Sequence, residues 1–225
     1  MRKLIVIMGC VVLGALSAPA YAQALQDKTA DELAAEFEAK AARGDAIVAE
    51  IGAIHARDQY LRELIIQTFK TIKSESVRKA FIDETRDVFH KVDGENTRRL
   101  IAVLDGIGWD ELEAMSPRAA DDAWSIISHS GDRAFKARMV ALFEPLALAG
   151  QMDGQKYAML YDDLALMDGR LQRYGTNSDC VDGRYQPKPT EDMAGVNARR
   201  AALGMTSIEE DARINEQVYG ACPAK

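Results

Sequence analysis

The stretch DAIVAEIGAIHARDQYLRELIIQTF, residues 45–69, sets the fold class of this chain. Its apolar residues recur at intervals of three or four positions, which is the spacing of one face of an α-helix. These residues are Ile47, Ile51, Ile54, Leu61, Leu64, Ile65 and Phe69. The side chain of Asp45 can cap the first turn. The pattern therefore predicts a long helix that begins near Asp45.

The same spacing continues on both sides of this stretch. Before it, a capping box at residues 29–32 predicts a helix that ends at Gly44. After it, Ser74 or Ser76 begins a helix in which Gly94 marks a bend or a break. Further helices are predicted over residues 119–129, from Asp132, from Asp153, and over residues 191–203 and 208–218.

Glycine and proline mark the breaks between these helices. Gly108 begins a connecting loop, and Pro117 suits the first turn of the next helix. Pro145 predicts a kink or an early end in its helix. The chain from Asp168 to Pro189 is rich in Gly, Asn, Asp and Pro, which predicts a long irregular loop. Because alternating β-branched runs are nearly absent, the sequence predicts an all-α, single-domain bundle of about seven or eight helices.

The first residues predict export from the cytoplasm. Two basic residues precede an apolar run over residues 4–16, and Pro19-Ala20-Tyr21-Ala22 fits a signal-peptidase site. Cleavage after Ala22 would leave residues 23–225 as one helical domain, periplasmic or secreted, with no membrane attachment. A permanent anchor is the alternative, but the run is shorter than the about 20 apolar residues that a span requires. Lipoprotein cleavage at Cys10 would leave an even shorter apolar core.

Removal of the signal would leave two cysteines, Cys180 and Cys222. An oxidising compartment allows them a single intramolecular pairing, so we predict a disulfide that ties the C-terminal tail to the loop around Cys180. A reactive thiol pair is the alternative, although the wide separation is unlike a C-x-x-C redox motif.

Charge and composition exclude some classes of partner. The chain carries 28 basic and 35 acidic side chains, for a net charge of −7. An acidic protein is poorly steered toward nucleic acid or anionic lipid, so we expect no nucleic-acid partner. A hydrophobic content of 48% favours a packed globule over a disordered chain.

Several short motifs occur in an order that is typical of one known family. They are Arg57-Asp58-Gln59-Tyr60-Leu61-Arg62, Asp93 with Asn96, Gly108-Trp109, Ile126-Ile127-Ser128-His129, Tyr157 to Asp162, and Gln172-Arg173-Tyr174-Gly175-Thr176. This order resembles the bacterial family catalogued as domain of unknown function 6624, a helical family without an assigned activity. The resemblance covers about residues 58–214, and its most specific part is the Gln-x-Tyr-Gly-Thr element. The chain departs from the family pattern at Ser128, Asp163 and Asn177, where the family commonly has Gln, Arg and Gln.

The early motif and His129 suggest two kinds of chemistry. Asp58 and Arg62 share a helix face at spacing i,i+4, beside Gln59, so Arg62 can hold an anionic group. An ion pair on a solvated surface is the alternative. His129 ends an apolar helix and can serve as an acid or a base. Equally, it can satisfy the free carbonyls at the end of that helix.

The polar side chains of the late motif can either line a pocket or hold the loop together through internal hydrogen bonds. Asp162, Gln172, Tyr174 and Thr176 are polar residues in or just before the long loop, and Gly175 permits a positive φ there.

Each histidine has an aspartate three residues away, a spacing that can build metal sites in helical bundles. These pairs are His55 and Asp58, Asp87 and His90, and His129 and Asp132. No zinc motif or phosphate-binding loop accompanies them, so we expect neither a metal nor a cofactor.

The sequence supports three functional hypotheses and leaves open whether the protein is an enzyme. The leading one is an exported helical protein that binds a small polar or peptide-like ligand through a shared polar cluster. That cluster would contain Asp58, Gln59, Arg62, His129, Asp162, Gln172, Tyr174 and Thr176. The second is a hydrolase-type enzyme with His129 as general base, oriented by Asp58 or Asp162. The third is a protein-interaction scaffold of the cell envelope.

Overall fold

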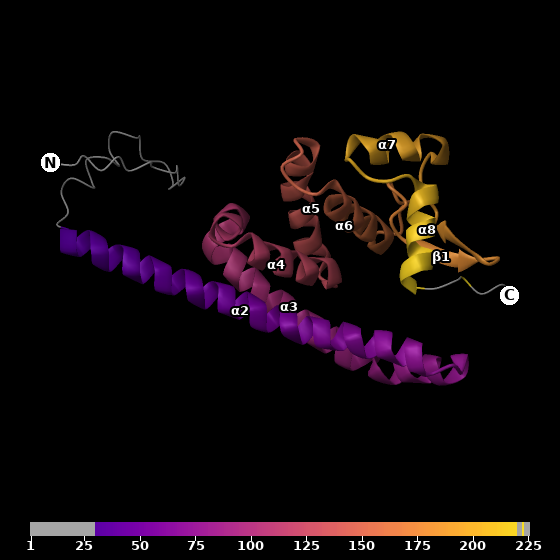
Figure 1. Cartoon of the computed structure of the whole chain (residues 1–225), viewed down its shortest axis with the longest axis horizontal. Helices are drawn as coiled ribbons and strands as arrows, with labels where there is room; N and C mark the ends of the chain where they lie inside the picture. The colour runs from indigo at the N-terminus through magenta and orange to yellow at the C-terminus, as the bar shows by residue number, and fades with distance from the viewer. Residues whose placement is uncertain (1–29, 220–221, 223–225) are drawn as a thin grey trace. The chain divides into compact units, whose positions relative to one another are not determined.

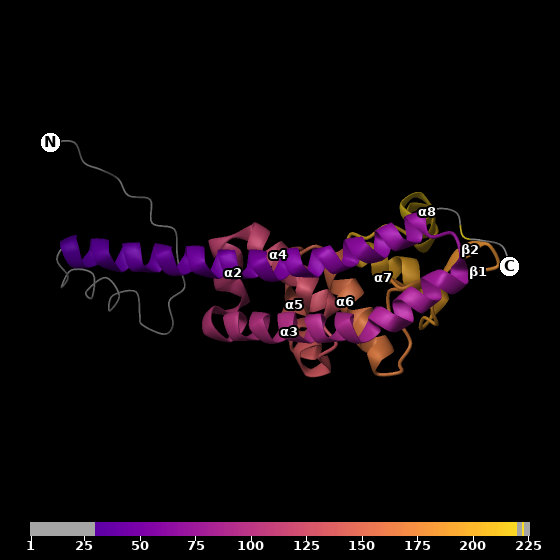
Figure 2. The same ribbon diagram turned by 90° about the horizontal axis from the view of Figure 1, so that it is seen from below.

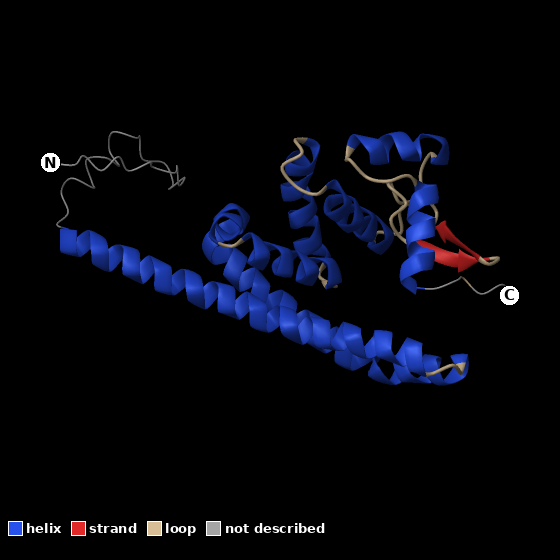
Figure 3. Ribbon diagram, in the orientation of Figure 1, coloured by secondary structure: helices blue, strands red, loops and turns tan. Residues whose placement is uncertain are grey.

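The computed structural model describes residues 30–219 and Cys222, and nearly all of the described elements are helices (Figure 3). The predicted signal sequence lies outside these residues. The chain divides into two compact units, Met1–Ile47 and Val48–Lys225. Within the first unit, the described residues 30–47 form a single stretch of helix.

The order of elements confirms the all-α fold class. Seven α-helices, two short strands and one 3₁₀ turn follow one another within residues 30–219. They are α2 (Ala30–Thr71), α3 (Glu75–Met115), α4 (Pro117–His129), α5 (Arg133–Leu148), α6 (Gly154–Met167), β1 (Ser178–Val181), β2 (Arg184–Pro187), η1 (Met193–Gly195), α7 (Val196–Ala202) and α8 (Ile208–Tyr219). Figure 1 shows their course along the chain.

Glycine breaks the long helices less often than the sequence predicts. Helix α2 continues through Gly44 and α3 continues through Gly94, so the predicted helix end at Gly44 is wrong. One glycine costs only about 1 kcal/mol in a helix, which a long packed helix tolerates. Gly108 does interrupt α3, with φ 75° and ψ 170°, but the helix resumes directly and ends at Met115. The predicted connecting loop is therefore a kink.

Part of the predicted irregular loop is a β-hairpin. Strands β1 and β2 pair in antiparallel fashion, with Cys180 opposite Tyr185. Asp182 and Gly183 join them with positive φ values of 50° and 76°. An Asp-Gly pair with this backbone is the usual two-residue hairpin turn. Cys180 forms the predicted disulfide with Cys222, at a Cα–Cα distance of 5.6 Å.

The core of the second unit lies where its helices meet. Helix α4 contacts α3 on one side and α5 and α6 on the other. Figures 1 and 2 show α4 beside the α2–α3 pair, with α5 and α6 beyond it. The fully buried apolar side chains include Ile51, Ile54, Leu100, Leu112, Ile126, Ile127, Met139, Phe143 and Leu160. No helix in the described part of the chain is long and apolar enough to cross a membrane.

Ion pairs fix the antiparallel register of α2 and α3. The pairs are Glu50–Arg99 at 2.7 Å, Arg57–Glu95 at 2.6 Å and Arg62–Asp93 at 2.9 Å. As the residue number rises along α2, the number of its partner falls along α3. Asp58 therefore lies at the level of residues 93–96, and this level contains the candidate site.

Candidate functional site

Asp58 and His129 form a contact between two helices that are far apart in the sequence. His129 is the last residue of α4, and its Nδ1 atom lies 2.9 Å from Oδ1 and 3.0 Å from Oδ2 of Asp58 on α2. Asp58 is only 1% exposed, whereas the His129 side chain is 32% exposed. Because an ionised carboxylate only accepts hydrogen bonds, Nδ1 of a neutral His129 carries the proton and Nε2 keeps its lone pair.

Two further predicted residues complete the surroundings of Asp58. Gln59 Nε2 donates to Asp58 Oδ2 at 2.9 Å. Arg62 Nη2 lies 3.5 Å from Asp58 Oδ1 and 2.9 Å from Asp93 Oδ1. A buried carboxylate requires such compensation for its lost hydration. Arg62 is therefore shared between two carboxylates of the protein, and its binding of an anionic ligand stays a prediction.

A cavity of about 710 Å³ adjoins this cluster, and His129 forms part of its wall. Its other lining residues come from α3 and from the turn between α4 and α5. They are His90, Asp93, Gly94, Thr97, Arg98, Gly131 and Asp132. The Asp132 carboxylate also caps α5, because its Oδ1 accepts a hydrogen bond from Phe135 N at 3.0 Å. The wall thus carries charges of both signs beside apolar surface.

The backbone next to His129 is anchored from two sides. Ser130 Oγ accepts hydrogen bonds from Thr97 Oγ1 at 3.0 Å and from Asp132 N at 3.1 Å. Lys136, which is 2% exposed, donates to the carbonyl of Ser128 at 3.0 Å and to Asp163 Oδ2 at 2.7 Å. These contacts hold the end of α4 and so fix where the imidazole can lie.

Asp162 lies in a second polar group, at the start of the long loop. Its carboxylate is 0% exposed and accepts backbone hydrogen bonds from Arg173, Tyr174 and Thr176, at 2.7, 3.1 and 2.9 Å. It also accepts the Thr176 hydroxyl at 2.9 Å. This carboxylate folds the loop around itself.

Gln172 plays a similar part in the same loop. Its side-chain oxygen accepts Asn177 N at 2.7 Å, and its Nε2 donates to the carbonyls of Asn177 and Lys188 at 3.0 and 3.1 Å. We call Asp162, Gln172, Tyr174 and Thr176, with their partners, the Asp162 knot. The polar side-chain atoms of Asp162 and Gln172 are used to shape the loop.

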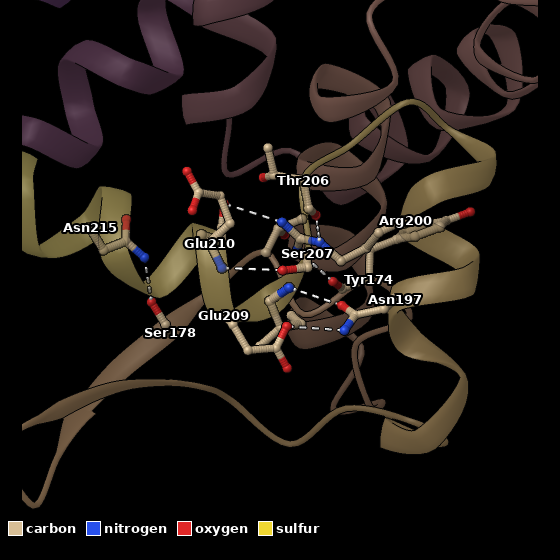
Figure 4. A network of polar contacts seen from close by, with 12 residues as sticks. Tyr174, Ser178, Asn197, Arg200, Thr206, Ser207, Glu209, Glu210 and Asn215 are labelled. Atoms are coloured by element: carbon tan, nitrogen blue, oxygen red, sulfur yellow. Dashed lines mark hydrogen bonds and ion pairs between the residues drawn. The ribbon is translucent and has the colours of Figure 1, made fainter.

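Arg200 fastens the knot to the C-terminal helices (Figure 4). Its side chain is 0% exposed, and its Nη1 and Nε atoms donate to the carbonyls of Tyr174 and Thr206 at 2.9 and 2.6 Å. It also forms an ion pair with Asp211 at 3.2 Å. A buried guanidinium with three such partners joins the loop to α7 and α8.

Three tyrosine rings pack together at the Asp162 knot. The rings of Tyr157, Tyr161 and Tyr174 pack against one another with centroids 5.7–6.1 Å apart. Burial raises the pKa of the Tyr157 phenol far above its usual value and also raises the pKa of Tyr174. These phenols therefore stay neutral in the folded protein at physiological pH.

The predicted cluster thus separates into two groups. Asp58, Gln59, Arg62 and His129 come together beside the cavity, whereas the late-motif residues form the Asp162 knot. Of the two aspartates considered as partners for His129, the structure brings Asp58 into contact.

The structure also shows cavity residues that sequence reasoning did not propose for a site. Thr97 and Arg98 are such residues, and the register of α2 against α3 is the signal that would have found them.

Two of the three histidines pair across helices and not along them. His55 Nδ1 lies 3.2 Å from Asp122 Oδ1, and His129 pairs with Asp58, so neither bonds the aspartate three residues away. Over the described residues, no group of three or more His, Cys, Asp or Glu side chains is arranged to hold a metal ion.

A family model for the family of unknown function DUF6624 matches residues 49–223. The chain belongs to this family. The DUF6624 match begins one residue after the second unit begins at Val48. It includes both the contact between Asp58 and His129 and the Asp162 knot. No curated protein and no solved structure matches the chain.

Proposed function

We propose that this DUF6624 protein is a hydrolase-type enzyme in which His129 acts as general base. The observation that supports this proposal is the 2.9 Å contact between the buried Asp58 carboxylate and His129 Nδ1, beside a cavity with charged lining residues. A carboxylate on one ring nitrogen fixes the tautomer that leaves the other nitrogen ready to take a proton. Positioned general bases of this kind contribute about 10²–10⁴ to the rate.

The proposed reaction uses water as the nucleophile. His129 Nε2 takes a proton from a water molecule in the cavity while the water oxygen bonds to the electrophilic centre of the substrate. The negative charge of Asp58 stabilises the imidazolium that forms. His129 then returns the proton to the leaving group as its bond to the substrate breaks, which restores the neutral ring. Asp58 stays ionised throughout.

A second candidate is binding of a small polar or peptide-like ligand without catalysis. The size of the cavity favours it, since about 710 Å³ lies within the range of ligand sites. For either function we propose a periplasmic or secreted location, which the disulfide supports because such bonds persist in oxidising compartments.

The test is hydrolysis of a panel of nitrophenyl carboxylic and phosphoric esters and nitroanilides by the chain that begins at Gln23. His129→Gln should lower kcat by about 10²–10⁴ with little change in KM, because it removes proton transfer. Asp58→Asn should lower kcat as well, since it removes the group that fixes the tautomer.

The matched control is His55→Gln, because His55 also contacts an aspartate across helices, Asp122 at 3.2 Å, but does not line this cavity. This variant should keep most of the activity. Full activity in His129→Gln would refute the catalytic proposal. A panel that is not hydrolysed, together with a ligand that raises Tm in wild type only, would favour the binding candidate.

A further inference from the structure

Asn96 is the one described residue whose side-chain donor and acceptor are both buried and both unpaired. The residue is 0% exposed, and neither Nδ2 nor Oδ1 has a hydrogen-bond partner among the described residues. Buried polar groups in folded proteins are nearly always paired, because an unpaired one loses its hydration without compensation. An apolar side chain of similar shape would fit this position at lower cost to stability.

The neighbours of Asn96 place it at the level of the Asp58–His129 pair. Glu95, directly before it, pairs with Arg57, which adjoins Asp58. Thr97, directly after it, bonds Ser130, which adjoins His129. Asn96 lies on the buried face of α3 together with Val92 and Leu100. It therefore lies in the layer of the core where α2 and the end of α4 meet.

The Asp58 carboxylate has room for another donor. Among the described residues, its hydrogen-bond donors are His129, whose Nδ1 lies within hydrogen-bond distance of both oxygens, and Gln59, and Arg62 lies farther away at 3.5 Å. A carboxylate can accept about four hydrogen bonds. Nδ2 of Asn96 is a donor of the required kind in the same layer of the core.

We propose that Asn96 is a positioning residue for the Asp58–His129 pair. Its amide hydrogen-bonds Asp58 when His129 gains positive charge in a reaction, and so holds the carboxylate against the ring. Hydrogen bonds of catalytic groups are often absent or long in the free protein and shorten in the reacting complex. A residue that is locally unfavourable for stability is expected at such a site. This inference rests on the proposed role of His129 as a base.

The test uses a reaction that needs no knowledge of the natural substrate. Diethyl pyrocarbonate acylates the unprotonated nitrogen of histidine, and mass spectrometry reports the rate for His129 separately from other histidines. The imidazole becomes positively charged as Nε2 attacks, which is the state that Asn96 should support. Asn96→Leu should lower this rate about 10-fold, the size of effect typical of an outer-shell partner.

The same variant should become more stable. Removal of two unpaired polar atoms should raise Tm by about 2–4 °C, the shift that a small stabilisation gives in a domain of this size. Asn96→Thr keeps a hydrogen-bond donor and should restore part of the His129 rate. The matched control is Thr97→Val. The hydroxyl of this buried neighbour donates a hydrogen bond to Ser130, so removal of that bond should lower Tm.

Opposite changes in Tm and in the His129 rate support the proposal. A raised Tm with an unchanged rate would overturn it, since Asn96 would then be only a defect of the core. A lowered Tm would also overturn it, because the amide would already have a partner. Full hydrolytic activity in His129→Gln would refute the proposed function alone, and the acylation rates would still decide the role of Asn96.

Discussion

The two most informative regions of this protein are built around buried aspartates with different partners. Asp58 is 1% exposed and Asp162 is 0% exposed. Asp162 is bonded by three backbone amides and one hydroxyl, all from a single loop. Asp58 is bonded by the side chains of His129 and Gln59, and His129 lines a cavity.

Under the proposed function, this difference separates a structural from a chemical use of a buried carboxylate. Backbone donors are fixed by the path of the chain and do not act as acids or bases near neutral pH, so the Asp162 carboxylate is committed to the loop. An imidazole can gain and lose a proton near neutral pH, and its ring can contact a ligand on the far side. Burial alone therefore does not distinguish the two aspartates, whereas the kind of partner does.

The largest effect expected from this comparison is on stability. Asp162→Asn should lower the free energy of unfolding by about 4 kcal/mol, because the new amide group would face backbone N–H donors that need an acceptor. Asp58→Asn should cost only about 1 kcal/mol, since its side-chain partners can reorient. Urea denaturation of both variants measures the difference.

Asp121→Asn is the surface control for this pair. Asp121 is 68% exposed and, within the described part of the chain, forms its ion pair with Lys156, so its change should stay within about 0.5 kcal/mol. Equal losses at Asp58 and Asp162 would break the distinction between the two regions.

The sequence predicts the helices well because their signals are local. The apolar spacing in α2, the Asp132 cap of α5 and Pro117 at the start of α4 all act within a turn or two. The disulfide is predictable if the predicted signal sequence is removed with Cys10, because the other two cysteines allow one pairing. The hairpin is missed although its Asp182-Gly183 turn is present, because the strands are only four residues long.

The site is predictable only as a set of residue types. Asp58 and His129 are separated by 71 positions, and their contact depends on how α2 packs beside α3 and α4. Local spacing suggests His129 with Asp132, but Asp132 caps α5 instead. The same spacing cannot show that Asp162 turns toward its own loop, because that depends on where Gly175 lets the chain reverse, with φ 65°.

Removal of the disulfide should cause a smaller loss of stability, and it tests whether the two regions are independent. Cys180→Ser with Cys222→Ser should lower the free energy of unfolding by about 3 kcal/mol, because the unfolded chain gains freedom. The acylation rate of His129 should stay unchanged, since the bond fastens only the hairpin and the C-terminal tail. A marked fall in that rate would show that the two regions are coupled.

The smallest effect expected is on stability at alkaline pH, and it concerns the buried tyrosines at the Asp162 knot. Burial raises the pKa of Tyr157 and Tyr174, so the folded state keeps two phenol protons that the unfolded chain loses above about pH 10. The contribution to stability is intact below that pH and falls as the pH rises toward the higher folded-state values. Part of the tyrosinate absorbance should therefore appear only together with loss of the helical circular dichroism. Tyr157→Phe with Tyr174→Phe should flatten the decline, because phenylalanine has no proton to lose. If all of the tyrosinate absorbance appeared while the helices were intact, the phenols of the knot would be accessible to water, as His129 is. The two regions would then differ only in the hydrogen-bond partners of their aspartates.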